Sequence, residues 1–292
     1  MDVQIIVGVI TPFIIIVLMW GVGLSLTFQD FDIIRKNPKL ILVAIAVQLI
    51  LVPLFAFSLN WMFGLTSSVA IGMILLASTP GGTTANIFSY LSKGNVALNV
   101  TLTAINTIIG IFSIPLFIYL AYFIYQKQGT VIPLQFGKIL QVLLVLLIPM
   151  TIGIATRTRY LRLAQSCEKY VSKLSFLAIL FLLGAALYNE KENLGTIIRT
   201  AGWPVVSFNL FCLGIGIIVS KAMKMSRADE SALVMELGIH NCILALGIAY
   251  SPTLLNDTVA AMPAAIYIVF MYITALPLAY WYRKKENQYR SL

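Results

Sequence analysis

Nine stretches of apolar residues constrain what this chain can fold into more than any other feature of its sequence. They run roughly over residues 5–26, 39–63, 67–92, 95–124, 136–156, 171–188, 201–221, 229–250 and 259–282. A helix that crosses a bilayer needs about 20 apolar residues. Hydrophobic residues make up 60% of the 292-residue chain and charged residues 11%, whereas a soluble domain carries about 25% charge. We therefore expect an all-α integral membrane protein of about nine transmembrane helices, a single domain over residues 1–292 surrounded by lipid.

Basic residues predict the orientation of these helices. If the N-terminus lies outside, the inner ends carry all but four of the 20 Lys and Arg residues. The four at outer ends are Lys127, Lys138, Lys191 and Arg199. Under the positive-inside rule, this asymmetry predicts an outside N-terminus and a cytoplasmic C-terminus in the inner (plasma) membrane. The net charge of +9 therefore reflects topology, and we expect no nucleic-acid partner because no basic stripe with interleaved aromatics is present.

Two further features of the sequence exclude common alternatives. The first apolar stretch lacks a basic n-region and is as long as a membrane span, so we expect it to be kept and not cleaved as a signal peptide. The three cysteines, Cys167, Cys212 and Cys242, are odd in number and have no paired spacing. We expect them to pack in or beside membrane segments, with no disulfide framework and no cysteine metal site.

Two of the nine stretches contain residues that interrupt a helix. The third contains Pro80-Gly81-Gly82 near its middle, and the eighth contains Glu236 to Asn241. Proline removes a backbone donor and glycine disfavours the helix, so a continuous helix is not expected at the first of these. The third and eighth spans run in opposite directions through the membrane. Paired, interrupted helices of opposite direction indicate an inverted-repeat transporter.

Glu236 is the strongest functional signal in the sequence. A carboxylate near the bilayer centre costs at least about 2.5 kcal/mol, so it needs a proton, a cation or a basic partner. No Lys or Arg lies in the middle of any predicted span. The sequence therefore leaves a bound sodium ion or a proton as its counterpart.

A polar stripe in the fourth stretch favours a cation. Asn99, Thr103, Asn106 and Thr107 recur on one helical face, and sodium prefers several oxygen ligands of the kind that amides and hydroxyls supply. The alternative is that these side chains join neighbouring helices by hydrogen bonds. Gln48, in the middle of the second stretch, is a further polar residue at membrane depth.

The interruptions also predict an anion site. After each one a new half-helix begins inside the membrane, with free backbone N–H groups and the positive end of its dipole. These half-helix starts, near Thr83–Asn86 and His240–Cys242, suit a carboxylate or sulfonate. Thr83, Thr84 and Asn241 would add side-chain donors. His240, four residues after Glu236, is expected on the same helical face as the carboxylate.

Several motifs resemble the bile acid:sodium symporter family. They are Gly21-x-Gly23-Leu24-x-Leu26-Thr27, Asp30-Phe31, Asn37-Pro38, Pro80-Gly81-Gly82-Thr83 with Asn86, Ser89-Tyr90-Leu91, Gly94-Asn95-Val96-Ala97-Leu98 and Glu236-x-Gly238-Ile239-x-Asn241. The resemblance covers nearly the whole chain and implies a core domain with two crossing, discontinuous helices, together with a smaller panel domain. The panel helices would lie roughly at residues 5–26 and 136–188, and the core helices roughly at 39–124 and 201–282. The chain looks like a nine-helix form that lacks the family's first helix.

The resemblance also implies the roles of particular residues. One sodium site would consist of Ala85, Asn86, Asn99, Thr103 and Glu236. A second would consist of Gln48, Glu236, Leu237, Ile239 and His240. The substrate cavity would reach Thr83 and Asn241, with Thr84 and Cys242 beside them. The chain departs from the family at three positions, because the family often has Ser at Ala85 and Asn99 and Gln at His240. Since nitrogen is a poor sodium ligand, we hypothesise that one sodium ion moves per cycle, or that coupling is partly to protons through His240.

We therefore predict a secondary active transporter, not an enzyme: a sodium-coupled symporter of a small organic anion, such as a bile acid, pantoate or a keto acid, that works as a monomer. A proton-coupled or sodium-independent organic anion transporter that uses Glu236 and His240 is the main alternative. An intramembrane enzyme is a remote one, because one deep acid and one histidine do not supply a nucleophile–base pair. A channel fits less well than a transporter, since a channel needs a ring of repeated polar residues.

Overall fold

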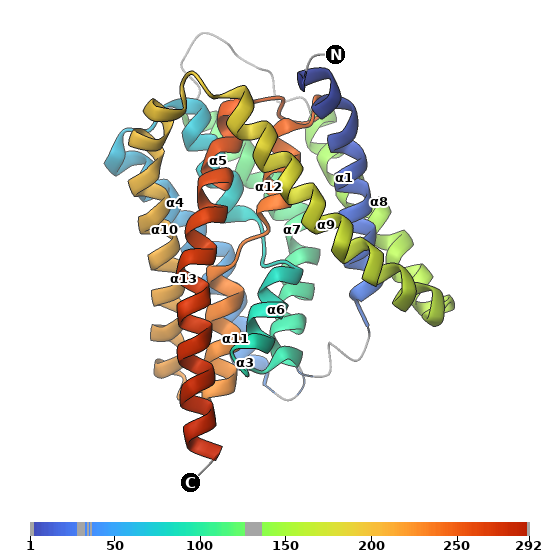
Figure 1. Cartoon of the computed structure of the whole chain (residues 1–292), viewed down its shortest axis with the longest axis vertical. Coiled ribbons are helices and arrows are strands. Elements are labelled where there is room, and N and C mark those ends of the chain that lie inside the picture. Colours follow the sequence, from blue (N-terminus) through green and yellow to red (C-terminus); the bar gives the residue numbers. More distant parts are fainter. Residues whose placement is uncertain (1–2, 28–32, 34, 36, 126–135, 291–292) are drawn as a thin grey trace.

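The computed structural model describes residues 3–27, 33, 35, 37–125 and 136–290. The secondary structure of this part is helical apart from one isolated β-bridge (Figure 1). The elements are α1 (Val3–Ser25), α3 (Pro38–Ala46), the π-helical turn η2 (Val47–Leu51), α4 (Val52–Phe63), α5 (Ser67–Ser78), α6 (Thr83–Leu91), α7 (Val96–Tyr125), α8 (Phe136–Arg159), α9 (Leu161–Asn189), α10 (Leu194–Ala222), α11 (Arg227–Gly238), α12 (Cys242–Tyr250) and α13 (Thr258–Arg290). The predicted all-α class is confirmed.

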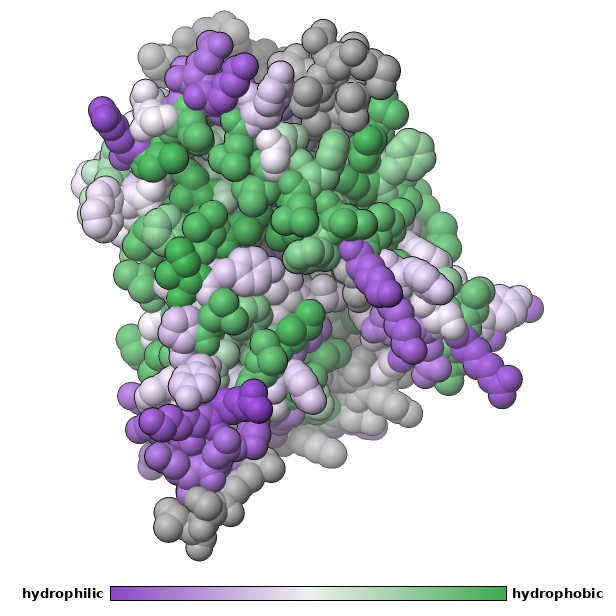
Figure 2. All heavy atoms as spheres, in the orientation of Figure 1, coloured by the Kyte–Doolittle hydropathy of each residue, from purple (hydrophilic) through white to green (hydrophobic). Residues whose placement is uncertain are grey.

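The helices have the length and composition of a multi-pass membrane protein. Within the described residues, 6 helices are long and apolar enough to cross a bilayer, and Val9–Ser25 and Ser67–Ser78 form shorter apolar helices. Figure 2 shows a broad hydrophobic zone across the middle of the molecule, with hydrophilic residues gathered towards its ends. The number of nine spans stays a prediction. The motif residues Asp30 and Phe31, and Lys127, lie outside the described residues.

Three helices extend beyond the apolar stretches that predicted them. α9 begins at Leu161 instead of residue 171, α10 begins at Leu194 instead of 201, and α13 continues to Arg290 instead of ending near 282. The added turns are rich in Leu, Arg, Lys, Ala, Gln and Glu, which all favour helix. Hydropathy marks only the part of a helix that lies in lipid, so it placed these ends too close to the membrane centre.

Local sequence signals account for several helix boundaries. Pro38 occupies the first turn of α3, where its missing N–H costs nothing. Gly64 ends α4 with φ of 58°, a left-handed conformation that glycine adopts without strain. Ser226 caps α11 by accepting a hydrogen bond from the Asp229 N–H, and acidic residues in that first turn complement the helix dipole. The π-helical turn that contains Gln48 precedes Pro53, which cannot donate a backbone hydrogen bond to it.

Two groups of helices meet along one side of the molecule. α1 packs against α8 and α9. The backbones of α1 and α8 approach closely because Gly23 of α1 lies against Gly153 of α8. A Cβ on Gly23 would lie 2.2 Å from the Met150 carbonyl oxygen. The interrupted helices pack instead among α7, α10 and α13, and α12 touches α1 and α9. This arrangement agrees with a division into panel and core helices, which stays a prediction.

The end of α13 joins the loops next to it. The Tyr282 hydroxyl donates to the Glu230 carboxylate at 2.7 Å, Lys93 donates to Asn287, and Arg227 donates to the Lys285 carbonyl at 3.4 Å. These bonds tie the turn after α6 and the start of α11 to the C-terminal helix at the lower end of Figure 1. The interrupted helices are therefore held at that end by α13.

Candidate functional site

The two predicted interruptions meet at one point in the structure. α5 ends at Ser78 and α6 begins at Thr83, while α11 ends at Gly238 and α12 begins at Cys242. The unwound segments between them form an antiparallel β-bridge that joins Gly81 and His240. The Asn241 N–H donates to the Pro80 carbonyl at 2.8 Å. The expected pair of crossing, discontinuous helices is thus present.

Buried side chains satisfy the carbonyl groups that the interruptions expose. The Thr79 carbonyl accepts hydrogen bonds from His240 Nδ1 at 2.8 Å and from Gln48 Nε2 at 3.4 Å. The Gly238 carbonyl accepts one from the Tyr267 hydroxyl at 2.8 Å. Irregular backbone survives at membrane depth only where protein or water satisfies it. These contacts explain how both helices can break inside the apolar zone.

The Glu236 carboxylate lies beside this crossing, 1% exposed. One oxygen accepts a hydrogen bond from the Thr103 hydroxyl at 2.5 Å, and the other accepts one from Asn106 Nδ2 at 3.2 Å. The backbone of Gly81 also contacts the carboxyl group. Among the described residues, no Lys, Arg or His nitrogen forms an ion pair with it. A buried, unpaired carboxylate of this kind needs a cation or a proton.

Amide and hydroxyl oxygens surround this carboxylate. The Thr103 hydroxyl contacts Asn86 Oδ1 at 3.4 Å as well as Glu236. Asn99 lies one turn earlier on α7, where its Nδ2 donates to the Ala232 carbonyl at 2.7 Å. The Oδ1 atoms of Asn99 and Asn106 are buried without a hydrogen-bond partner. Asn106 contacts the carboxylate directly, and Asn99 contacts the backbone one turn before it on α11. Buried, unpaired oxygens in this region are ligands that a sodium ion would complete.

The structure corrects the expected position of His240. Because α11 ends at Gly238, His240 lies in the unwound segment and not on the helical face of Glu236. Its Nδ1 faces the Thr79 carbonyl, so Nδ1 carries the hydrogen, and Nε2 lies 3.7 Å from the Cys212 sulfur. The ring packs against Phe208 and Tyr267, which also contact each other. The imidazole therefore does not neutralise Glu236 directly.

The other residues that were predicted to bind sodium lie on both sides of the crossing. Ala85 is buried in the first turn of α6, close to Asn86 in sequence. Leu237 and Ile239 are buried on either side of Gly238, and the Leu237 backbone contacts His240. Gln48 shares the Thr79 carbonyl with His240, and its Oε1 is buried without a partner. Both predicted sets are thus grouped around the crossing.

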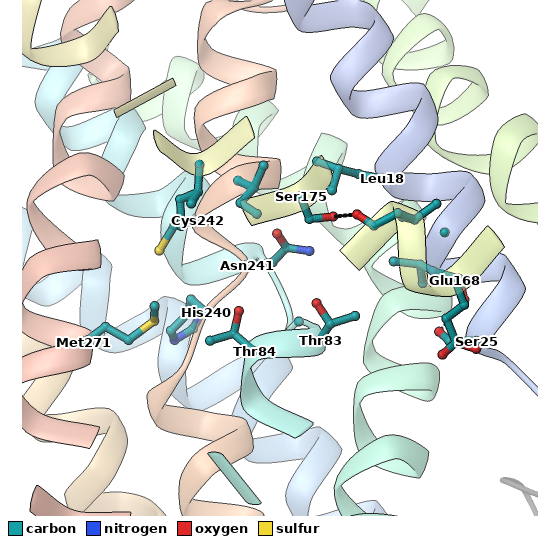
Figure 3. Close-up of a pocket in the computed structure, with 16 residues that line it drawn as sticks. Leu18, Ser25, Thr83, Thr84, Glu168, Ser175, His240, Asn241, Cys242 and Met271 are labelled. Atoms are coloured by element: carbon teal, nitrogen blue, oxygen red, sulfur yellow. Dashed lines mark hydrogen bonds between the residues drawn. The ribbon is translucent and has the colours of Figure 1, made fainter. Parts of the chain in front are cut away.

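A small cavity lies between the crossing and the helices α1 and α9. The residues predicted to bind substrate, Thr83, Thr84, Asn241 and Cys242, all line it (Figure 3). Asn241 Oδ1 caps α12 by accepting a hydrogen bond from the Leu244 N–H at 3.1 Å. The nitrogen of this amide therefore points into the cavity, as Figure 3 shows. The starts of α6 and α12 give this wall of the cavity hydrogen-bond donors.

Sequence reasoning missed several residues of this region. Asn106 was recognised as part of the polar stripe but not as a partner of Glu236. The Thr79 carbonyl and the Tyr267 hydroxyl carry no signal in one sequence, because their roles depend on contacts between distant helices. Ser25, Glu168 and Ser175 line the far wall of the cavity, and a single sequence does not show that α1 and α9 face the interrupted helices.

Comparisons with known proteins identify the family of this chain. The profile of the sodium bile acid symporter family matches residues 12–197. A sodium-dependent transporter of Bacillus subtilis, YocS, is 28% identical over 93% of this chain and 83% of its own length. The probable chloroplastic sodium/metabolite cotransporter BASS2 of rice is 26% identical over 92% of this chain and 62% of its own. The human hepatic sodium/bile acid cotransporter is 26% identical over 85% of this chain and 72% of its own.

These relatives are transporters, and the family model covers well over half of the chain. The protein is accordingly a multi-pass membrane transporter and not an enzyme, and sodium coupling holds at the level of the family. The interrupted helices, the buried carboxylate and the match all lead to one assignment. The chain belongs to the sodium bile acid symporter family.

Proposed function

We propose that this protein is a sodium-coupled symporter that carries a small organic anion across the inner (plasma) membrane by alternating access. The observation that carries the proposal is the Glu236 carboxylate, which is buried, free of any ion pair within the described residues, and surrounded by amide and hydroxyl groups. A side chain so placed binds a cation at membrane depth. Its negative charge attracts the cation, and the bound cation in turn favours an anion at the neighbouring half-helix starts.

Sodium would bind beside Glu236 on the α7 side of the crossing. Asn86, Asn99, Thr103 and Asn106 would supply neutral oxygens, and two of these amides have unpaired buried oxygens that support the assignment. The first turn of α6, with Ala85, would add backbone carbonyl oxygen. Glu236 would supply the single negative charge, which distinguishes this pocket from an uncharged hydrogen-bonding cluster.

We propose that only one sodium ion moves in each cycle. The second group, Gln48, Leu237, Ile239 and His240, offers the unpaired Gln48 oxygen, but the His240 ring is held between Thr79 and Cys212 and packed against two aromatic rings. A nitrogen ligand suits sodium poorly, since hard cations prefer oxygen. Proton coupling through Glu236 is the alternative that the experiment below distinguishes.

The substrate anion would bind at the starts of α6 and α12. Backbone N–H groups there, together with Thr83, Thr84 and the Asn241 nitrogen, form the donor-rich wall of the cavity. The cavity separates the proposed core, residues 39–124 and 201–282, from the proposed panel, residues 5–26 and 136–188. Rocking of one group against the other would expose the site to each side in turn.

The proposed topology makes this an inward-facing state. With the N-terminus outside, the Ser25 end of α1 and the Glu168 end of α9 lie on the cytoplasmic side, and both residues line the cavity. The anion would therefore leave between α1, α9 and the start of α6.

Uptake into proteoliposomes tests the proposal. A panel of radiolabelled anions that includes taurocholate, pantoate and pyruvate is offered under an inward sodium gradient, an inward proton gradient or neither. We expect one or more anions to accumulate under the sodium gradient alone and to be recovered unmodified. Accumulation that follows the proton gradient without sodium would overturn sodium coupling, and chemical alteration of the recovered anion would overturn transport as the activity.

A further inference from the structure

The two walls of the cavity have opposite hydrogen-bonding character. On the core wall, Asn241 Oδ1 is occupied in capping α12, which leaves its nitrogen as a donor to the cavity. On the opposite wall, Ser25 donates its hydroxyl hydrogen to the Val22 carbonyl at 2.8 Å, and Ser175 donates to the Val171 carbonyl at 2.8 Å. Because each serine hydroxyl already donates its hydrogen to a carbonyl of its own helix, each can only accept a hydrogen bond from a ligand.

Glu168 makes this acceptor character stronger. Among the sixteen residues that line the cavity, it is the one acid, and no Lys or Arg lines the cavity with it. Its carboxylate can only accept hydrogen bonds when ionised. In the part of the chain that the structure describes, the carboxylate forms an ion pair with Arg157 of α8, whose Nη1 lies 3.5 Å from Oε2. Arg157 balances the charge of Glu168, so an anion can enter, while the other carboxylate oxygen remains available.

The spacing of the acceptors along α9 indicates how long a ligand must be to reach from the core wall to Glu168. Glu168, Val171, Ser175 and Ile179 line the cavity from one face of the helix. Figure 3 shows Asn241 close to the level of Ser175, with Glu168 further towards Ser25. Seven residues separate Ser175 from Glu168, which is roughly 10 Å along a helix. A ligand that binds the donors near Asn241 can therefore reach Glu168 with a group about two helical turns away.

We propose that the cavity selects an organic anion that also carries a hydroxyl or ammonium group, and that Glu168 accepts a hydrogen bond from that group. The inference rests on the proposed function, since it assigns the anionic end of the substrate to the core wall. The three acceptors of the opposite wall are half-buried, and the Glu168 side chain is 42% exposed. A simple carboxylate would displace water from these acceptors without supplying donors in its place. Leaving such groups unpaired is what makes a polar site reject an analogue that lacks the matching hydrogen.

The test measures binding in detergent with three matched series of medium-chain carboxylates: unsubstituted, ω-hydroxy and ω-amino, each long enough to span roughly 10 Å. Binding is followed by thermal shift in the presence of sodium. In wild type we expect the hydroxy or the amino series to bind about tenfold or more tightly than the unsubstituted series. Glu168→Leu should abolish this preference. Glu168→Gln keeps an acceptor oxygen without charge, so it should retain a preference for hydroxyl and lose one for ammonium.

Gln165→Leu is the matched control, because Gln165 is exposed on α9 and does not line the cavity; it should bind like wild type. Unfolding temperatures without ligand check that each variant folds. Equal binding of all three series by wild type, or an unchanged preference in Glu168→Leu, would overturn the inference while leaving organic anion transport intact. Failure of every carboxylate to bind, with no sodium-driven uptake of the wider anion panel, would instead contradict the proposed function and this inference with it.

Discussion

Gly81 and Glu236 are in contact across the two interrupted helices, and the space between them is too small for a methyl group. A Cβ on Gly81 would lie 2.5 Å from Glu236 Oε2 and 2.7 Å from Cδ. By contrast, a Cβ on the neighbouring Gly82 would lie 3.4 Å from the nearest side-chain atom of Asn241, an ordinary contact. Gly82 therefore has room for a methyl side chain, whereas Gly81 does not.

The first prediction compares these two glycines. Gly81→Ala should push the carboxylate away from Thr103 and Asn106 and weaken sodium binding by about tenfold or more, since buried overpacking costs on the order of 1–3 kcal/mol. Gly82→Ala should change it by about twofold or less. Gly82→Val, with its branched side chain, should impair binding because it reaches further towards Asn241. Isothermal titration with sodium measures all three, and equal losses in the two alanine variants would contradict the assigned position of the carboxylate.

The second prediction concerns the charge of Glu236. Glu236→Gln keeps the size of the side chain and one acceptor oxygen but removes the negative charge that balances a cation. We expect the variant to fold and to lose concentrative, sodium-driven uptake. Asn209→Asp, at a buried site elsewhere in the core, controls for a change of charge at depth. Wild-type accumulation by folded Glu236→Gln would rule out the coupling role.

The third prediction concerns Asn106, whose Oδ1 is buried without a partner while its Nδ2 donates to Glu236. Asn106→Leu removes one proposed oxygen ligand and one donor to the carboxylate. The sodium concentration for half-maximal uptake should rise about tenfold, because a hydrogen bond to a charged group contributes about 1.5–3 kcal/mol. Thr107→Val is the control on the same helix, since its hydroxyl donates to the Thr103 backbone at 2.7 Å. A sodium response unchanged in Asn106→Leu would remove Asn106 from the site.

The fourth prediction concerns the number of sodium ions. We expect the sodium dependence of wild-type uptake to have a Hill coefficient of about one. His240→Gln introduces an oxygen where the ring now lies between Thr79 and Cys212, and should steepen the response. Measurements at several pH values show whether protons contribute in wild type. Identical sodium and pH profiles for the two proteins would return His240 to a purely structural role.

The fifth prediction tests orientation. Single cysteines that replace Lys191 and Arg159 are labelled with a membrane-impermeant maleimide in intact cells, in a background without the native cysteines. The Lys191 position, beyond the end of α9, should react from outside, and the Arg159 position, at the end of α8, should be protected. Equal labelling of both would contradict an outside N-terminus.

Much of the architecture could be predicted because its causes are local. Pro80-Gly81-Gly82 interrupts a helix wherever it stands, and a carboxylate in an apolar stretch indicates an ion site without knowledge of its neighbours. The polar stripe on α7 and the half-helix starts also follow from helix geometry alone. These features are enough to predict most of the residues that lie around the crossing.

The rest depends on contacts between distant segments. The spacing of four residues puts His240 on the Glu236 face only if the helix continues to His240, whereas α11 ends at Gly238 and the next residues form the bridge to Gly81. The π-helical turn at Gln48 leaves no mark in residue periodicity. Glu168 lies outside every predicted span, and only the packing of α9 against α1 and α12 brings it to the wall of the cavity.

The bridge between Gly81 and His240 has a consequence for how relatives of this protein can diverge. Successive residues in an extended segment face opposite sides, so inserting or deleting one residue in either unwound segment would turn Gly81 away from Glu236 or turn His240 away from Thr79. The length of each unwound segment is therefore constrained by the other half of the chain. Insertions that separate relatives should fall in the loops between helices and never in residues 79–82 or 239–241.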